Sequence, residues 1–146
     1  MGTREYTLED FKSSARQFVQ QLTPAREATV VALHGDLGAG KTTFVQEVAH
    51  TLGIYEDVVS PTFVIQKNYL LEGQVFGKLV HIDAYRLENA EELKVLGWED
   101  VQRDPANLVC IEWAENVADL LAPETHHVYF AYVDDDTRSI AHGKEH

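Results

Sequence analysis

The chain has 146 residues, with 12 lysines and arginines against 24 aspartates and glutamates, which gives a formal net charge of −12. A chain of this length buries roughly 70% of the surface that it exposes when unfolded, so it can build a hydrophobic core without disulfides. Its single cysteine, Cys110, excludes an internal disulfide framework and is typical of a reducing compartment. The negative charge opposes non-specific binding of nucleic acid, so we expect any connection with RNA to be indirect.

No segment of the sequence is long and apolar enough for a membrane span, and the first residues lack the apolar core of a signal peptide. We therefore expect a cytoplasmic protein that has no membrane partner. The sequence contains no internal repeat, low-complexity run or Gly/Ser/Pro-rich linker. It predicts a single domain over residues 1–141, followed by a flexible tail over 142–146.

The first half of the chain alternates helix and strand patterns. Thr7 followed by Asp10 is typical of a helix N-cap, and apolar residues then recur at helical spacing as far as residue 23. Residues 28–34 form a β-branched apolar run that ends in glycines, which predicts a central strand buried on both faces. A glycine loop follows, and the apolar residues of 44–52 share one face of a second helix.

The second half of the chain predicts an antiparallel hairpin and then further alternation. Two apolar runs, 62–70 and 75–83, flank the turn Glu72-Gly73. The remaining predicted elements are a helix in 88–97, a buried strand in 107–113, a short helix in 115–122, and a strand pair in 126–133 and 137–141. Together these patterns predict an α/β fold of three layers, like that of the P-loop NTPases, with a mixed central sheet.

The strongest motif is Gly35-Asp36-Leu37-Gly38-Ala39-Gly40-Lys41-Thr42, which matches GxxxxGK followed by Ser or Thr and lies between a predicted strand and a predicted helix. Glycines let successive backbone N–H groups form a nest for phosphate oxygens, and the helix N-terminus adds its positive dipole end. Lys41 can neutralise the β- and γ-phosphates, and the Thr42 hydroxyl can ligate the Mg²⁺ that bridges them. The alternative, a glycine turn with a chance lysine, does not explain the flanking strand and helix. The predicted cofactor-binding residues of this loop are Gly35, Asp36, Leu37, Gly38, Ala39, Gly40, Lys41, Thr42 and Thr43.

Two carboxylates are candidates for the acid that completes such a site. Asp83 ends the apolar run 79–82, and Glu112 ends the apolar run 108–111, so each is expected where a buried strand stops. Phosphoryl transfer needs one group to hold or orient the Mg²⁺ shell and another to orient the water. We assign Glu112 to Mg²⁺, and Asp83 to the outer shell of the metal or to the attacking water; the opposite allocation remains open.

Other conspicuous residues carry simpler interpretations. Cys110 lies inside an apolar strand and is predicted to be a small core residue. His126 and His127 should face opposite sides of a strand, and no Cys/His cluster has zinc spacing. The acidic residues of 88–92 predict a solvated helix face, with protein docking as the alternative that a family resemblance implies.

Five blocks of the sequence, in order, resemble the TsaE family, also called YjeE, the small bacterial P-loop ATPases needed for threonylcarbamoyladenosine synthesis on tRNA. The blocks are GDLGAGKTTF (35–44), SPTF (60–63), HIDAYRL (81–87), EELKVLG (91–97) and IEWAE (111–115). The glycine loop is common to many ATPases, whereas the SPTF, HxDxYR and EW blocks distinguish this family.

The resemblance implies roles for several further residues. Ser60-Pro61-Thr62 would act as a switch-like loop near the γ-phosphate, with the Thr62 hydroxyl reaching the Mg²⁺ shell; a strand-entry turn is the alternative. Arg86 would pair with an acid or neutralise phosphate charge, unless it is a surface arginine. Trp113 and Glu115 would flank the nucleotide, with core packing as the alternative for Trp113. Arg138 matches a loosely placed family arginine near the nucleotide.

The resemblance also implies an activity and partners. It implies an Mg²⁺-dependent ATPase, slow unless a partner activates it, that regulates a complex of TsaB and TsaD type subunits for modification of tRNA position 37. ATP is preferred to GTP by resemblance, and the chain has no NKxD motif for guanine. A small-molecule P-loop kinase is one alternative, although the region after Glu112 is short of the arginines that a kinase lid carries. A non-hydrolysing ATP-binding adaptor is another.

Overall fold

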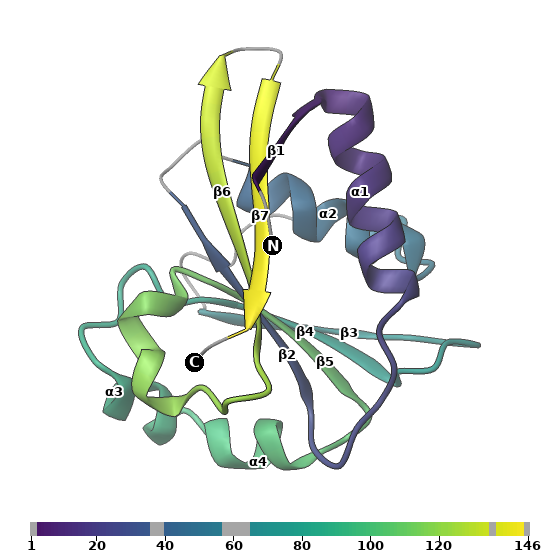
Figure 1. Cartoon of the computed structure of the whole chain (residues 1–146). Helices are drawn as coiled ribbons and strands as arrows, with labels where there is room; N and C mark the ends of the chain where they lie inside the picture. Colours follow the sequence, from purple (N-terminus) through teal and green to yellow (C-terminus); the bar gives the residue numbers. More distant parts are fainter. Residues whose placement is uncertain (1–2, 36–39, 57–64, 135–136, 145–146) are drawn as a thin grey trace.

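The structure is a computed structural model that describes residues 3–35, 40–56, 65–134 and 137–144. Seven described strands form one sheet in the order β1-β7-β6-β2-β5-β4-β3 (Figure 1). The strands are β1 (Thr3–Thr7), β2 (Thr29–His34), β3 (Gln66–Leu70), β4 (Lys78–Asp83), β5 (Asn107–Glu112), β6 (His126–Asp134) and β7 (Thr137–Lys144). The helices are α1 (Leu8–Gln20), α2 (Lys41–Thr51), α3 (Ala90–Val95), α4 (Trp98–Arg103) and the 3-10 helix η1 (Ala114–Leu120).

The sheet is mixed, as predicted. The four central strands β6, β2, β5 and β4 run parallel to one another, whereas β3 and β7 pair antiparallel with their neighbours. β2 therefore occupies the middle of the sheet, where the sequence placed a strand buried on both faces. The carboxyl ends of the parallel strands meet at one edge, which is where ligands bind in open α/β sheets.

Alternate residues of the central strands pack into two different cores. Val31 and Leu33 of β2 belong to the core that α1 and α2 cover, while Val30 and Ala32 belong to the core that α3, α4 and η1 cover. Figure 1 shows α1 and α2 together on one side of the sheet, with α3 and α4 on the other. The predicted three-layer α/β fold is thus confirmed.

The first helix begins as the sequence predicts. The Thr7 side chain accepts a hydrogen bond from the Asp10 backbone N–H at 3.4 Å, which caps α1. Phe11, Ala15 and Val19 then recur on one helical face and are buried in the first core. None of the helices that the structure describes is long and apolar enough to cross a membrane.

Three parts of the chain differ from the prediction. The predicted helix in 88–97 ends at Val95, and a further helix, α4, starts after Gly97, whose φ of 100° interrupts the first helix. β1 was not predicted, since it is a polar edge strand. β7 pairs with β6 as far as Lys144 opposite His126, so the predicted boundary at Ala141 and flexible tail are corrected for residues 142–144.

The glycine before α2 is held in a conformation and a space that only glycine fits. Gly40 has φ 115°, and a Cβ added there would lie 2.9 Å from Cζ of the buried Phe11. Gly97 has a similar φ of 100°, but apart from its own neighbours along the chain no atom of the described residues lies within 4 Å of an added Cβ. We expect Gly97→Ala to lower the free energy of unfolding by about 1–2 kcal/mol through backbone strain. Gly40→Ala should lower the free energy of unfolding by about 1–3 kcal/mol more than Gly97→Ala does, because the Phe11 ring must shift.

Urea unfolding of the two glycine variants measures this difference directly. Both substitutions place alanine at a positive φ, so Gly97→Ala serves as the control for backbone strain. Equal losses at Gly40 and Gly97 would contradict the packing argument and show that the Phe11 ring yields without cost.

Candidate functional site

The predicted site residues converge on the carboxyl edge of the parallel strands. Gly35 follows the end of β2, and Lys41 and Thr42 open α2. Asp83 and Glu112 are the last residues of β4 and β5, and they are paired in the sheet register. The sheet therefore brings Gly35, the N-terminus of α2 and both predicted carboxylates to one edge.

Both carboxylate oxygens of Glu112 have a partner. Glu112 is buried, with 3% of its surface exposed. The Thr42 hydroxyl donates to its Oε1 at 3.0 Å, and the Nε2 atom of His81 lies 2.6 Å from its Oε2. This places the carboxylate directly against the first turn of α2, where the unpaired backbone N–H groups of a helix favour negative charge.

Asp83 is buried beside it and is oriented by the backbone that follows. Its Oδ1 accepts a hydrogen bond from the Tyr85 N–H at 2.9 Å, which forms an Asx turn. The Asp83 N–H donates to the Ile65 carbonyl at 2.7 Å. This backbone contact fixes the strand end that carries Asp83 against Ile65.

Lys41 is held by the loop and by an aromatic ring. Its side chain is buried, and the Nζ atom donates to the Gly35 carbonyl and lies 3.7 Å from the centroid of the Trp113 ring. Trp113 directly follows β5 and adopts φ 58°, a left-handed conformation that is uncommon outside glycine. It also lies 5.1 Å from the Tyr85 ring and packs against the second core. Trp113 thus packs against the second core, which is one of its two predicted alternatives, and its ring also covers Lys41.

The oxygen donors of this site fit an Mg²⁺ ion that is shared with a phosphate. The Thr42 hydroxyl and the Asp83 and Glu112 carboxylates are hard ligands of the kind that Mg²⁺ prefers. Within the described residues, no group of three or more His, Cys, Asp or Glu side chains is placed to hold a metal ion. Mg²⁺ is commonly held by one or two carboxylates together with water and phosphate oxygens, so a partial protein donor set is what this chemistry needs.

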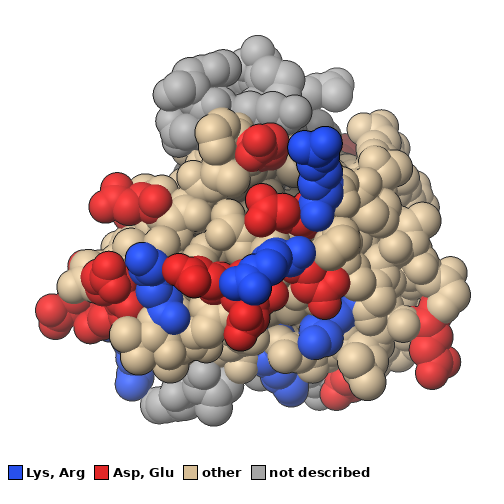
Figure 2. All heavy atoms as spheres, turned by 90° about the horizontal axis from the view of Figure 1, so that it is seen from below, with Lys and Arg blue, Asp and Glu red and all other residues tan. Residues whose placement is uncertain are grey.

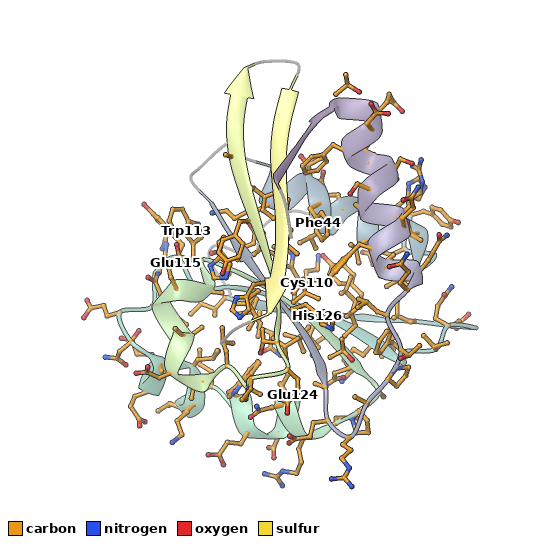
Figure 3. The ribbon with its side chains drawn as sticks, in the orientation of Figure 1. Phe44, Cys110, Trp113, Glu115, Glu124 and His126 are labelled. Atoms are coloured by element: carbon orange, nitrogen blue, oxygen red, sulfur yellow. The ribbon has the colours of Figure 1, made fainter. Side chains whose placement is uncertain are left out.

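The structure describes the remaining predicted residues to different extents. Thr43 is the third residue of α2, and Arg86 is exposed in the turn after β4. Glu115 is exposed in η1, with its Oε1 3.7 Å from Nδ1 of His34; Figure 3 shows Glu115 and Trp113 at the same end of the molecule. Arg138 lies in β7 opposite Tyr132 of β6, and its side chain lies outside what the structure describes. Thr62 and residues 36–39 of the glycine loop also lie outside the described residues.

The sequence interpretation assigned no role to His81. This side chain is fully buried, comes from β4, and contacts Glu112 of the neighbouring strand. The signal available in the sequence is its spacing of two residues from Asp83, because alternate residues of a strand face the same side. Only the pairing of β4 with β5 shows that its partner is Glu112.

His126 and His127 follow the prediction. His126 stacks edge-on against Phe18 of α1, with ring centroids 6.0 Å apart. His127 faces the other side, where its Nδ1 lies 2.8 Å from Nε2 of His34. The two neighbours in sequence therefore face opposite layers, as expected of a strand.

Cys110 is a buried core residue, as predicted. Burial raises the pKa of its thiol from 9.0 to about 12, and the negative charge of Glu112 adds to the rise. In the unfolded chain the thiol ionises near its ordinary pKa, so the folded state binds more protons between about pH 9 and 12 and loses stability as the pH rises through that window.

We expect the native protein to resist a thiol reagent at pH 8 and the urea-unfolded protein to react fully, as measured by absorbance. Rapid modification of the native protein would contradict this burial.

The acidic residues of 88–92 have a local structural role. The Asn89 side chain accepts from the Glu92 N–H at 3.2 Å, and the Glu92 carboxylate accepts from the Glu88 N–H at 2.9 Å, so these residues cap α3. Figure 2 shows the underside of the molecule, where acidic and basic side chains are interspersed. The Glu92 carboxylate therefore helps to cap α3, while Glu88 contributes its backbone N–H and is exposed.

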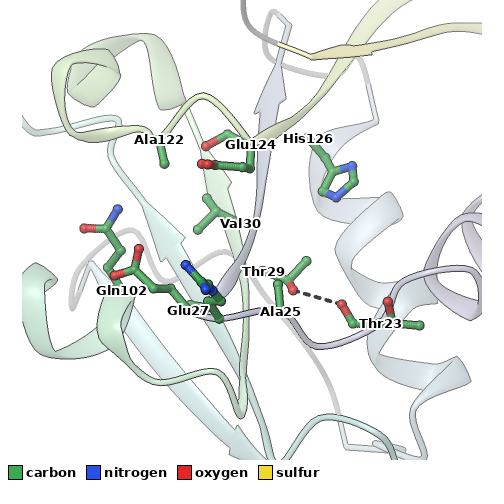
Figure 4. A pocket seen from close by; sticks show the side chains of 12 residues that line it. Thr23, Ala25, Glu27, Thr29, Val30, Gln102, Ala122, Glu124 and His126 are labelled. Atoms are coloured by element: carbon green, nitrogen blue, oxygen red, sulfur yellow. Dashed lines mark hydrogen bonds between the residues drawn. The ribbon is translucent and has the colours of Figure 1, made fainter.

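A pocket of about 500 Å³ lies at the opposite end of the sheet. It is lined by the start of β2, the start of β6 and the chain before β2, including Arg26, Thr29 and Thr125 (Figure 4). Thr29 donates to the Thr23 carbonyl at 3.4 Å within it. Because it lies at the amino ends of the strands, this pocket is separate from the candidate site.

The family model and the relatives that match this chain carry the same description. A family model described as threonylcarbamoyl adenosine biosynthesis protein TsaE matches residues 6–140. The tRNA threonylcarbamoyladenosine biosynthesis protein TsaE of Rickettsia typhi is 36% identical over 135 residues, which cover 92% of this chain and 88% of the relative. The protein of that name from Bacillus subtilis is 39% identical over 117 residues, covering 80% and 70% of the two chains.

A solved structure agrees in fold. The crystal structure of YdiB from Bacillus subtilis superposes with a TM-score of 0.69 at 30% identity, covering 95% of this chain and 83% of that chain. Taken together with the family model, which spans nearly the whole sequence, these similarities show that the chain belongs to the TsaE family.

Proposed function

We propose that this chain is a single-domain, Mg²⁺-dependent ATPase that serves the threonylcarbamoyladenosine modification of tRNA position 37. The observation that carries the proposal is the hydrogen bond of 3.0 Å between Thr42 at the start of α2 and Glu112 at the end of β5. This contact joins the two parts that P-loop NTPases use to hold a metal-bound nucleotide, the loop hydroxyl and the strand-end carboxylate.

The backbone of the glycine loop and the first turn of α2 bind the phosphates through their N–H groups. Lys41, which donates to the Gly35 carbonyl, lies close enough to that loop to turn its ammonium group toward the β- and γ-phosphates. Thr42 and Glu112 would hold Mg²⁺, which supplies neutralisation of the phosphate charge when bound. Asp83, fixed by its Asx turn next to Glu112, orients the attacking water.

The contacts of the two acids support this allocation. Glu112 touches the Thr42 hydroxyl, which would be the loop group that holds Mg²⁺. Asp83 is bound by the backbone of Tyr85 and lies on β4, one strand further than β5 from β2. As further parts of the proposal, the Thr62 hydroxyl reaches the metal shell, and Arg86 neutralises phosphate charge. Glu115 and Arg138 contact the nucleotide.

The place in the pathway rests on the family and on the names of its relatives, which refer to threonylcarbamoyladenosine biosynthesis of tRNA. In this proposal the nucleotide state regulates a complex of TsaB and TsaD type subunits in the cytoplasm, and hydrolysis is slow until that complex binds. The formal charge of −12 favours a protein partner over direct contact with tRNA phosphates.

Release of inorganic phosphate from ATP, measured with and without the TsaB/TsaD-type complex, tests the activity. We expect slow release by the chain alone and faster release with the complex. Binding of ATP without release of phosphate in either condition would contradict the proposed ATPase activity. It would favour the alternative of a non-hydrolysing ATP-binding adaptor. Transfer of the γ-phosphate to an added small molecule instead of water would point to a kinase.

A further inference from the structure

The carboxylate of Glu112 is held from two sides. On the side of α2, the Thr42 hydroxyl donates to Oε1 at 3.0 Å. On the side of β4, Nε2 of His81 lies 2.6 Å from Oε2. With one oxygen assigned to each partner, the carboxylate plane and the direction of Oε1 are determined by the pair.

The protonation of the imidazole follows from its partner. An ionised carboxylate only accepts hydrogen bonds, so His81 must carry its hydrogen on Nε2 and donate it to Glu112. The other ring nitrogen, Nδ1, is buried and has no hydrogen-bond partner in the described part of the chain. The contact with Glu112 is thus the only one that the described structure gives the polar atoms of this fully buried ring.

The burial of both groups makes this contact costly to lose. His81 is 0% exposed and Glu112 is 3% exposed, so no water layer can replace either partner. A carboxylate that lost its donor on Oε2 would be left with an unpaired oxygen in a dry environment, and it would rotate toward any remaining donor. That rotation would move Oε1 away from the position beside Thr42.

We propose that His81 is a positioning residue that fixes the Glu112 carboxylate, so that Oε1 stays beside the Thr42 hydroxyl and is available to the Mg²⁺ of a bound nucleotide. This inference rests on the proposed function. It assigns to His81 the role that outer partners of metal ligands have, which is to orient a ligand without touching the metal.

The test is the Mg²⁺ dependence of nucleotide binding, which does not require turnover. A fluorescently labelled, non-hydrolysable ATP analogue is titrated with the full-length protein in EDTA and across a series of MgCl₂ concentrations, and anisotropy is recorded. His81→Leu removes the donor. His81→Gln keeps an amide N–H at nearly the reach of Nε2, whereas the shorter His81→Asn does not reach Oε2.

We expect His81→Leu and His81→Asn to raise the Mg²⁺ concentration for half-maximal tightening by roughly 10-fold or more, with less than about 2-fold change in EDTA. His81→Gln should restore most of the wild-type Mg²⁺ dependence. Asn107→Leu is the matched control: it removes a buried side-chain hydrogen bond, to the Val101 carbonyl at 3.0 Å, from the other end of β5. It should lower the melting temperature without shifting the Mg²⁺ dependence.

The outcomes separate this inference from the proposed function. Wild-type protein that binds the analogue without any response to Mg²⁺ would contradict the proposed function. A normal wild-type response that is unchanged in His81→Leu and His81→Asn would overturn the role of His81. Should His81→Leu fail to fold, the comparison of Gln with Asn decides the matter, and equal behaviour of these two variants also overturns it.

Discussion

Replacing Lys41 by alanine should weaken ATP binding by ~100-fold or more, which corresponds to about 3 kcal/mol of lost charge-assisted hydrogen bonding. Lys41 is buried at the start of α2, where it donates to the Gly35 carbonyl and lies over the Trp113 ring at 3.7 Å. The Lys41 ammonium group is buried next to the phosphate loop and is covered by an aromatic ring, so its attraction to phosphate is only weakly screened by water and salt. Isothermal titration calorimetry with ATP measures the effect.

Lys67→Ala is the matched control for the loss of one positive charge next to an aromatic ring. Its Nζ lies 5.2 Å from the centroid of the Tyr69 ring, but β3 is the outermost strand on its side of the sheet. This variant should bind ATP with wild-type affinity. Unchanged affinity in Lys41→Ala would remove the basis for a phosphate site at the glycine loop.

Glu112→Gln and Asp83→Asn should preserve the fold and lower the rate of ATP hydrolysis by ~100-fold or more. The amide of glutamine can accept from His81 and remain beside Thr42, and that of asparagine can accept from the Tyr85 N–H, so both networks stay satisfied. What is lost in each case is a negative charge. Glu112→Gln should also raise the Mg²⁺ requirement, whereas Asp83→Asn should lower turnover even at saturating Mg²⁺, because the two acids are assigned different tasks.

Steady-state phosphate release across MgCl₂ concentrations distinguishes these effects. Glu47→Gln provides a matched control on α2, since its carboxylate pairs with Arg16 at 2.8 Å on the surface between α1 and α2. Wild-type rates for both site variants would show that other groups hold the metal and the water. A raised Mg²⁺ requirement in Asp83→Asn alone would reverse the allocation of the two acids.

The main features of the fold follow from local patterns in the sequence. The apolar run before Gly35 and the amphipathic pattern after Lys41 predict β2 and α2 on each side of the loop, and the structure has both. Apolar runs that end in Asp83 and Glu112 also predict that the two acids meet, because the ends of parallel strands lie at one edge of a sheet.

Contacts between residues that lie far apart in the sequence could not be predicted from such local patterns. The contact between His81 and Glu112 requires the register of β4 on β5, and the contact between Lys41 and Trp113 requires the left-handed turn after β5. β1 has no apolar run, and β7 continues to Lys144 through its backbone pairing with β6. Edge strands of this kind gain their stability from a neighbour, which a local pattern does not contain.

In the proposed site, Thr42 and Glu112 together hold the metal of a bound nucleotide. The most direct test is calorimetric titration of wild type and Glu112→Gln with a non-hydrolysable ATP analogue, in EDTA and in MgCl₂. We predict one bound nucleotide per chain, tighter in MgCl₂ than in EDTA for wild type, with most of this difference lost in Glu112→Gln. An identical response to Mg²⁺ in the two proteins would show that the Glu112 carboxylate does not hold the metal.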